Sequence, residues 1–425
     1  MTTDSVPATP PPQPGAGAQD AYRQARECLA ADDIKGATHW LERAAADDHP
    51  AAATELAIVL LHGFGRDADP PRALALLERA AAVGGTAETS WLLAQIVVGG
   101  VLTPYDPARV DTLLVDAARR GFPAALRVAG LCFGRDPDPQ MQQAASECLR
   151  RATQLRDPVG AALYADRLHA GIGIARDERT ASDLAAQLRA MGIPVELPPA
   201  TATSPDAAGA AGDPPWHRLQ HRDDRPRSRV DHGHAPEVAT WDACLNDEEC
   251  RYVIYSGARF LERSLVVHPE TGQPLEKGLR TSQDMVFVPT HDEVGIRLLQ
   301  RRMAALGGLD LGRCEPLTLL RYRPGEEYRP HRDYFTPSAP QLAQPGGQRH
   351  TTVCVYLNDV ERGGETAFPD VRAMVKPERG RAVMFRSLHP DGSPDPRSLH
   401  AGLPVLAGEK WLSTCWIRVH PLRAF

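Results

Sequence analysis

The sequence predicts a multidomain protein in which an N-terminal α-solenoid of helical-hairpin repeats precedes a β-rich domain of the sandwich or jelly-roll class. Three observations predict this arrangement. The first half repeats itself at steps of 35 to 37 residues. A Pro-, Ala- and Gly-rich stretch breaks the repeat from residue 196, and short β-type segments fill the chain after residue 315. A chain of 425 residues is long enough for two or three domains.

Two sequence markers recur in phase between residues 20 and 195. The tripeptide that begins at Arg43 recurs at Arg79, Asp116 and Arg151, at steps of 36, 37 and 35 residues. Glycines recur at positions 63, 99, 134 and 171, at steps of 36, 35 and 37 residues. Apolar residues between the markers fall at helical spacing, as in Ala73, Leu76, Leu77 and Ala80. Each repeat is therefore expected to form two short helices around a glycine-bearing turn, and neighbouring repeats must stack to bury their apolar faces.

The repeat region resembles the Sel-like branch of the tetratricopeptide family. The resemblance rests on LLHGFGRDADPPRALALLERAAAVGG (60–85) and on its echo RLHAGIGIARDERTASDL (167–184). It implies an interaction surface that recruits a protein or peptide client, and it implies no catalytic residue. A purely structural helical domain is the alternative interpretation. No histidine of this region pairs with a nearby cysteine or carboxylate at metal-site spacing. We therefore expect turn or helix-surface positions for His39, His49, His62 and His169.

Composition predicts the domain boundaries of the chain and the cellular compartment of the protein. Residues 1–19 are expected to be disordered and residues 196–235 to form a flexible linker, which leaves 20–195 for the repeats and 236–425 for the second domain. The linker is Arg-rich between residues 218 and 229, but its excess of positive charge is small and the whole chain carries 48 − 54 = −6, so nucleic acid is not favoured as a partner. The N-terminus lacks the features of a signal peptide, and no stretch is apolar enough to span a membrane. Eight scattered cysteines without a C-x-x-C pair suit free thiols, so we expect a cytoplasmic protein.

The second domain begins with helical segments and continues with strands. LNDEECRYVIYSGARFLE and THDEVGIRLLQRRMAALGG predict two helices, with Asp247 expected as the N-cap of the first. Five later segments predict strands: PLTLLRYRP, HTTVCVYLND, RAMVKP, RAVMFRSL and KWLSTCWIRVH. In the second of these, period-2 alternation places Thr352, Cys354 and Tyr356 on one face of the strand.

Three His-x-Asp sequences compete as part of a metal site. The one at His221 lies in the Arg-rich linker, and the one at His389 has Pro at its centre in a turn-rich segment. The one at His331 and Asp333 follows a predicted strand, where residues two apart share one face. SLHAGLPVLAGEKWLSTCWIR then supplies His400 as a third ligand and Lys410 as a possible anchor for a co-substrate. Two histidines and one carboxylate are typical of non-haem Fe(II) oxygenases, whereas a structural zinc needs a fourth protein ligand.

Residues 236–420 resemble the prolyl 4-hydroxylase-like Fe(II)/2-oxoglutarate dioxygenases. The matching segments occur in order: LNDEEC, SLVVHPETG, RTS, LLRYRPGEEYRPHRDYF, YLNDVERGGETAFPD, VKPERGRAVMF and DGSPDPRSLHAGLPVLAGEKW. The resemblance implies a double-stranded β-helix (jelly roll) with flanking helices. It also implies that His331, Asp333 and His400 hold the iron, and that Lys410 pairs with the distal carboxylate of 2-oxoglutarate. Tyr322 and Thr352 match positions that hydrogen-bond the co-substrate.

The resemblance implies an enzyme that uses Fe(II), 2-oxoglutarate and O₂, with ascorbate as reductant, and that releases succinate and CO₂. Because Asp333 is a carboxylate, oxygenation is favoured over the halogenation performed by relatives that carry a small residue there. A peptidyl proline is the leading substrate, with a free amino acid or another protein side chain as alternatives. Segment 260–282 corresponds to a variable loop over the substrate, with Arg280 a possible contact; Tyr328 and Trp416 line the substrate cleft or belong to the core. The alternative function is a scaffold or sensor that binds the cofactors and acts through its repeats.

Overall fold

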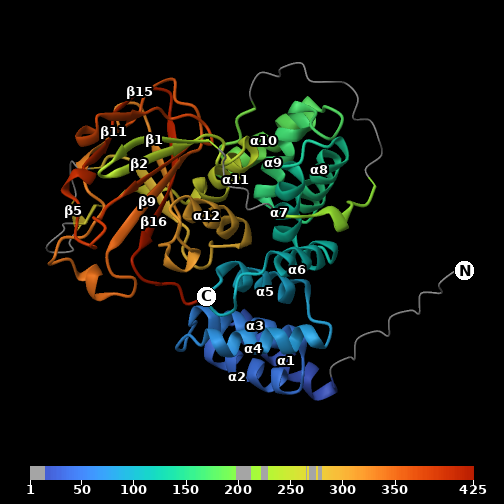
Figure 1. Cartoon of the computed structure of the whole chain (residues 1–425). Coiled ribbons are helices and arrows are strands. Elements are labelled where there is room, and N and C mark those ends of the chain that lie inside the picture. Colours follow the sequence, from blue (N-terminus) through green and yellow to red (C-terminus); the bar gives the residue numbers. More distant parts are fainter. Residues whose placement is uncertain (1–14, 198–211, 222–227, 265, 268–273, 276–279) are drawn as a thin grey trace, which may run out of the picture. The chain divides into compact units, whose positions relative to one another are not determined.

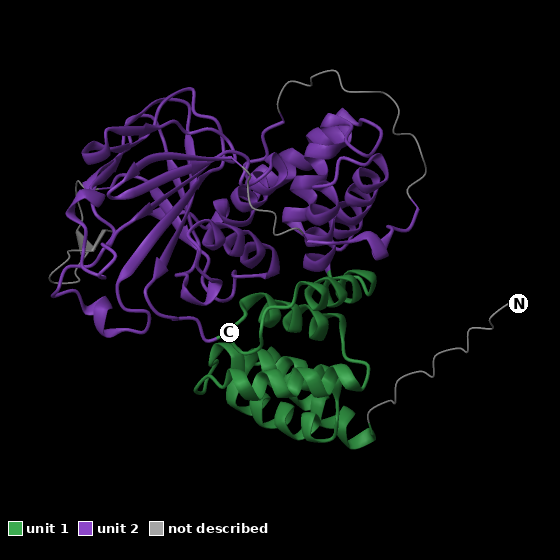
Figure 2. Ribbon diagram, viewed as in Figure 1, with its two compact units in different colours: residues 1–122, 425 green, residues 123–424 purple. Residues whose placement is uncertain are grey.

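The computed structural model describes residues 15–197, 212–221, 228–264, 266–267, 274–275 and 280–425 (Figure 1). The chain divides into two compact units, one of residues 1–122 with residue 425 and one of residues 123–424 (Figure 2). This division falls within the run of helices, between α6 and α7. The domain boundaries predicted from composition stay a prediction, and residues 1–14, 198–211 and 222–227 of the expected disordered and linker segments lie outside the described residues.

Ten helices form five successive hairpins, which confirms the predicted helical-hairpin architecture. Three hairpins belong to the first unit: α1 (Ala16–Ala30) with α2 (Ile34–Ala46), α3 (Pro50–His62) with α4 (Pro70–Ala82), and α5 (Ala87–Gly99) with α6 (Pro107–Arg119). Two belong to the second unit: α7 (Pro123–Gly134) with α8 (Pro139–Gln154), and α9 (Pro158–Ala170) with α10 (Glu178–Ala190). No helix in the described ranges is long and apolar enough to cross a membrane.

The repeat period reflects how the helices begin and end. Asp-Pro pairs start several helices: the aspartate side chain accepts a hydrogen bond from the first turn, and proline at the first helical position loses no hydrogen bond. Gly63 and Gly171 end α3 and α9 with φ values of 71° and 70°, a left-handed conformation that side chains disfavour. The second recurrent glycine, Gly99, differs from these two because it is the last residue of α5. The residue after it, Gly100, has the left-handed conformation that ends the helix.

The β-rich region consists of two main antiparallel sheets, which confirms the predicted jelly roll. The large sheet has the order β1-β2-β13-β9-β16-β7-β6-β3 and the small sheet the order β12-β11-β14-β8. The strands of the large sheet are β1 (Arg229–His234), β2 (Glu237–Trp241), β3 (Glu262–Arg263), β6 (Gln283–Val286), β7 (Thr318–Tyr322), β9 (Arg349–Tyr356), β13 (Ala382–Arg386) and β16 (Lys410–Arg418). Those of the small sheet are β8 (Tyr328–His331), β11 (Thr366–Phe368), β12 (Ala373–Val375) and β14 (His400–Gly402). Two further pairs are β4 (Val266–Val267) with β5 (Pro274–Leu275) and β10 (Arg362–Gly363) with β15 (Val405–Ala407).

The core of the β-rich region draws on residues from both sheets. Its buried members are Val238, Leu320, Tyr322, Tyr356, Phe368, Val375, Val383, Phe385, Val405 and Leu412. Because side chains alternate between the two faces of a strand, the register that buries these residues also fixes which neighbours face inward.

Helices α11 (Asp247–Gly257) and α12 (Val294–Leu306) confirm the two predicted helices of this domain. The N-cap of α11 is Asn246, so the prediction of Asp247 is wrong by one residue. The Asn246 side chain accepts a hydrogen bond from the Glu249 backbone, and the Glu249 carboxylate accepts one from the Asn246 backbone. This reciprocal capping box fixes the start of the helix one residue earlier.

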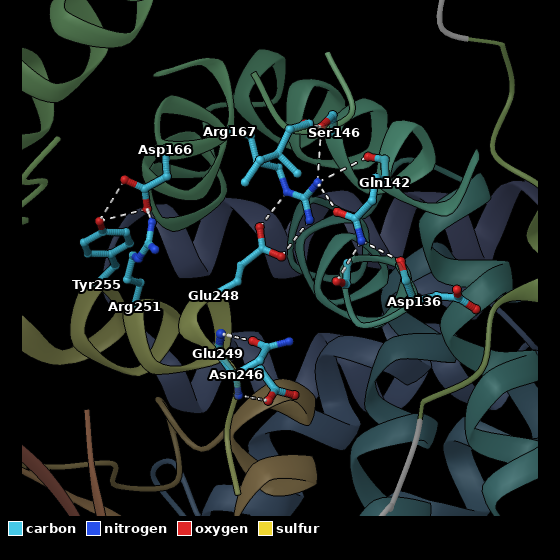
Figure 3. A network of polar contacts seen from close by, with 12 residues as sticks. Asp136, Gln142, Ser146, Asp166, Arg167, Asn246, Glu248, Glu249, Arg251 and Tyr255 are labelled. Atoms are coloured by element: carbon cyan, nitrogen blue, oxygen red, sulfur yellow. Dashed lines mark hydrogen bonds and ion pairs between the residues drawn. The ribbon is translucent and has the colours of Figure 1, made fainter. Parts of the chain in front are cut away.

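Helix α9 contacts α11 through buried charged groups (Figure 3). The Arg167 guanidinium donates two hydrogen bonds to the carboxylate of Glu248, at 2.6 and 2.8 Å. Asp166 accepts from the Tyr255 hydroxyl at 3.0 Å and forms an ion pair with Arg251 at 3.4 Å. Burial raises the pKa of Asp166 to about 6, and the Arg251 and Tyr255 contacts oppose that rise. The last repeat hairpin is therefore joined to α11 by polar contacts between partly or fully buried side chains.

Glu249 is the most buried carboxylate of this contact and accepts from two arginines. Arg135, which directly follows α7, donates to it at 2.7 Å, and Arg302 of α12 donates at 2.9 Å. Burial would raise the pKa of Glu249, but Arg302 and Arg135 hold it below its ordinary value. The carboxylate is 3% exposed, so both guanidiniums depend on it for their charge balance.

We expect Glu249→Ala to lower the free energy of unfolding of the 123–424 unit by about 3–5 kcal/mol, because it leaves the buried guanidinium of Arg302 and the partly buried one of Arg135 without this carboxylate. Urea denaturation of the full chain measures the change. The control is Glu178→Ala, whose partner Arg176 is 42% exposed while Glu178 is 60% exposed. Such an exposed pair contributes no more than about 1 kcal/mol. Equal losses in both variants would contradict a special role for the buried carboxylate.

Candidate metal and co-substrate site

The small sheet brings two of the predicted ligands together. His331 is the last residue of β8, His400 is the first residue of β14, and the two residues are directly paired in the antiparallel register. Asp333 lies two residues after β8, and its Oδ1 is 3.5 Å from Nε2 of His331 and 3.8 Å from Nε2 of His400. In the described part of the chain these three residues form the one cluster of histidine, cysteine and acidic side chains whose ligand atoms lie within 4.8 Å of one another.

Both imidazoles are oriented by backbone carbonyls. Nδ1 of His331 lies 2.8 Å from the Arg329 carbonyl oxygen, and Nδ1 of His400 lies 3.0 Å from the Ser398 carbonyl oxygen. A carbonyl can only accept, so each Nδ1 carries the proton and each Nε2 presents a lone pair toward Asp333. Burial, with the neighbouring His331, lowers the pKa of His400 to about 4, so this ring is neutral at pH 7.

Asp333 is a buried carboxylate with two differently placed oxygens. It is 7% exposed, and its Oδ2 accepts a hydrogen bond of 2.5 Å from the Thr352 hydroxyl. Burial alone would raise the pKa of Asp333, but His400 and His331 hold it well below its ordinary value. The group is therefore ionised, and Oδ1 is the oxygen that faces the two imidazoles.

The donor set fits a divalent iron ion. Two imidazole nitrogens and one carboxylate oxygen lie close together, and each imidazole already has the carbonyl partner expected of a metal-bound histidine. Three protein ligands leave coordination positions open for a chelating co-substrate and O₂. A dicarboxylate bound beside them also needs a cation for its far end.

Lys410 supplies a buried cation on the opposite sheet. It begins β16 and is paired in register with Tyr322 of β7, so both side chains face the same way. Lys410 is 2% exposed, and its Nζ donates to the Gly364 carbonyl at 2.7 Å. Among the residues that the structure describes, no carboxylate forms an ion pair with it. Burial lowers the pKa of Lys410 to about 8, which indicates a cation that lacks a full counter-charge.

All six predicted site residues line one cavity. They are Tyr322, His331, Asp333, Thr352, His400 and Lys410. The Tyr322 hydroxyl is buried, and burial raises its pKa above its ordinary value, so it is a protonated donor at neutral pH. Thr352 contacts Asp333, whereas its predicted contact with the co-substrate stays a prediction. The assignment of the six residues to iron and to co-substrate likewise stays a prediction.

Thr366 is among the cavity residues that the sequence did not single out. Its hydroxyl oxygen accepts from the buried Tyr356 hydroxyl at 2.6 Å. The only sequence signal for Thr366 is its place in the family-matching segment YLNDVERGGETAFPD. Tyr328 stacks on His331 with ring centroids 3.5 Å apart, and Tyr328, Trp416 and Arg280 line the same cavity.

The two other His-x-Asp sequences do not join this site. Nδ1 of His389 lies 3.5 Å from Asp395, in a turn that does not contribute to the cavity. His221 is buried, but it lies outside the cavity, and residues 222 and 223 fall outside the described residues.

The fold and the site together define a 2-oxoglutarate- and Fe(II)-dependent dioxygenase. A family model described as the 2OG-Fe(II) oxygenase superfamily matches residues 317–418, which contain every one of the six site residues. Probable prolyl 4-hydroxylase 10 of Arabidopsis thaliana is 36% identical over 204 residues, covering 44% of this chain and 70% of the plant protein. Prolyl 4-hydroxylase 1 of the same plant is 37% identical over 206 residues, covering 43% of this chain and 71% of the plant protein. The chain belongs to the prolyl 4-hydroxylase family.

Two solved structures are each similar to part of this chain. A viral collagen prolyl hydroxylase of Paramecium Bursaria Chlorella virus-1 is 28% identical, covers 43% of this chain and 95% of its own, and has a TM-score of 0.33. A Sel1 repeat protein from Oxalobacter formigenes is 19% identical, covers 41% of this chain and 73% of its own, and has a TM-score of 0.36.

The residues of the cavity would have different roles, some in binding the metal and others in binding the co-substrate. His331, His400 and Asp333 would hold Fe(II), which supplies the oxidising chemistry of the family together with 2-oxoglutarate. Lys410 would neutralise the remote carboxylate of the co-substrate, and the Tyr322 hydroxyl lies in register beside it. Thr352 donates a hydrogen bond to Asp333, and the stacked ring of Tyr328 covers one face of His331. Most of the side chains around the cavity are buried, so charge pairs within it are stronger than at the surface.

The pKa of Lys410 predicts a pH dependence. Because this pKa is about 8 in the protein, kcat/KM for 2-oxoglutarate should fall as pH rises through about 8, where the ammonium loses its proton. Steady-state rates on both sides of that pH measure it. Lys410→Arg is the control, since a guanidinium keeps its charge throughout and should flatten this limb of the profile. A wild-type profile that stays flat would contradict the assignment of Lys410 as the anchoring cation.

Lys410→Met should separate co-substrate binding from folding. Loss of the ammonium removes one partner of a buried charge pair, so the KM for 2-oxoglutarate should rise by roughly a hundredfold to a thousandfold. The thermal midpoint should not fall, because the variant also removes a buried charge without an ion-pair partner. Lys376→Met, at an exposed lysine, should change neither quantity. An unchanged KM in Lys410→Met would rule out the predicted role.

Proposed function

We propose that this protein hydroxylates a peptidyl residue, with proline as the leading substrate, and couples the reaction to conversion of 2-oxoglutarate and O₂ into succinate and CO₂. Ascorbate would serve as the reductant that keeps the iron ferrous. The chain's family supports the reaction class, and its relatives are named as prolyl 4-hydroxylases.

One observation carries the proposal. A ligand set of two histidines and one carboxylate faces the same cavity as a buried lysine without an ion-pair partner in the described residues. This arrangement matches a metal ion chelated by one end of a dicarboxylate whose other end reaches Lys410. A cavity that held a metal alone would have no use for a buried ammonium, whose burial is costly without an anionic partner.

The aromatic residues that line the cavity support a cyclic, weakly polar side chain as substrate. Tyr328 and Trp416 are flat aromatic surfaces beside the triad, and a proline ring offers no donor that such surfaces would leave unpaired. A free amino acid would need charged partners for its ammonium and carboxylate groups, and Arg280, the other cationic lining residue, is already paired with Asp284. A peptide substrate has neither of these terminal charges at the reacting residue.

We further propose that the helical repeats recruit a protein client and that the protein acts in the cytoplasm, with nucleic acid and membranes not favoured as partners. All eight cysteines are free thiols, as suits a reducing compartment. A scaffold or sensor role is the alternative function, and it would show tight binding of iron and 2-oxoglutarate without product formation.

The test is formation of succinate from 2-oxoglutarate in the presence of O₂ and a proline-containing client, with mass spectrometry of the client for addition of one oxygen atom. His331→Ala should lower succinate formation by more than about 100-fold, since loss even of an outer-shell partner typically costs 10–100-fold. His389→Ala is the matched control, because this histidine belongs to another His-x-Asp sequence and lies outside the cavity. Undiminished turnover in His331→Ala would overturn the iron assignment, and turnover of free proline alone would overturn the peptidyl substrate.

A further inference from the structure

Thr352 connects the two sheets at the candidate metal site. It belongs to β9 of the large sheet, whereas Asp333 directly follows β8 of the small sheet. The Thr352 hydroxyl donates to Oδ2 of Asp333 at 2.5 Å, and Thr352 is 1% exposed. The bond is therefore short, charge-assisted and shielded from water, which makes it stronger than a typical hydrogen bond between neutral groups.

This contact makes the two oxygens of Asp333 inequivalent. Oδ1 faces the Nε2 atoms of His331 and His400, while Oδ2 points to the hydroxyl. A carboxylate held in this way presents one oxygen to a metal ion. Without the hydroxyl, rotation of the carboxylate could bring both oxygens to the ion and occupy a position that a chelating co-substrate needs.

The backbone leaves the Thr352 side chain little freedom. Thr352 is paired in register with Phe385 of β13 on one side and Trp416 of β16 on the other, and both neighbours line the cavity. A β-branched side chain on a central strand has a restricted χ1 angle, so its hydroxyl is already directed when the sheet forms.

We propose that Thr352 is a positioning residue that holds Asp333 in one-oxygen ligation of the metal. The proposal rests on the proposed function, and it differs from the expectation that Thr352 hydrogen-bonds the co-substrate. The two roles predict different measurements. Loss of a positioning contact weakens binding of the metal itself, whereas loss of a co-substrate contact raises the KM for 2-oxoglutarate and leaves metal binding unchanged.

The experiment measures Co(II) binding to the full-length protein without 2-oxoglutarate, by titration and by the visible absorption spectrum of the bound ion. Thr352→Val removes the hydroxyl and keeps the branched shape, and Thr352→Ser restores a hydroxyl. Thr351→Val is the matched control: Thr351 is the adjacent residue, is also fully buried, and accepts from Arg386 at 2.7 Å on the other face of the strand. Thermal midpoints of all variants report any general loss of stability.

We expect Thr352→Val to weaken Co(II) binding by 10–100-fold, the usual cost of losing an outer-shell partner, and to change the absorption spectrum of the bound ion. Thr352→Ser should remain near wild type, and Thr351→Val should bind as wild type. Wild-type affinity in Thr352→Val, or an equal loss in Thr351→Val, would overturn the positioning role alone. If the wild-type protein does not bind Co(II), or if its binding of Co(II) does not depend on His331, the proposed function is overturned instead.

Discussion

The buried carboxylate of Asp333 is the group on which the arrangement of the site depends. A negative charge that is 7% exposed needs compensation from its neighbours. The Thr352 hydroxyl donates to Oδ2, and Oδ1 faces the Nε2 atoms of the two imidazoles. These partners come from three strands and from both sheets, so the carboxylate can be satisfied only after the two sheets have packed together. Packing of the two sheets therefore also brings the candidate metal ligands together, and the negative charge at Oδ1 favours a cation at that position.

A second constraint is the separation of charge within one cavity. Asp333 is anionic at the small sheet, and Lys410 is cationic on the large sheet with a carbonyl as its hydrogen-bond partner. Strand register determines both ends: His331 pairs with His400 in one sheet, and Tyr322 pairs with Lys410 in the other. A slip of one residue in either pair would turn a functional side chain out of the cavity, because neighbouring residues face opposite sides. The site therefore depends on backbone pairing as much as on the identity of its side chains.

The sequence predicted what local chemistry determines. Helices of the repeats begin at Asp-Pro pairs and end at glycines, which are local signals visible in the sequence. The ordered motifs also identified His331, Asp333, His400 and Lys410, which the fold brings into one cavity. It did not predict contacts that depend on distant partners. The capping box at Asn246 was missed by one residue, because Asp and Asn are both good caps and the reciprocal bond to Glu249 decided between them. The bond between Thr352 and Asp333 was missed because strand alternation gives the face of a side chain and not the group that it meets across the two sheets.

The contact between the last repeat hairpin and α11 did leave a signal in the sequence. Counted from the recurrent glycines, Asp166 and Arg167 of α9 occupy the positions that Ile58 and Val59 occupy in α3. Asp166 and Arg167 are nonetheless 7% and 3% exposed, and they bind Tyr255, Arg251 and Glu248 of α11 (Figure 3). Charged residues at a repeat position that is apolar in α3, and in an otherwise buried helix, require polar partners from outside the repeat. A break in the repeat's own pattern thus marks a helix that contacts the β-rich domain.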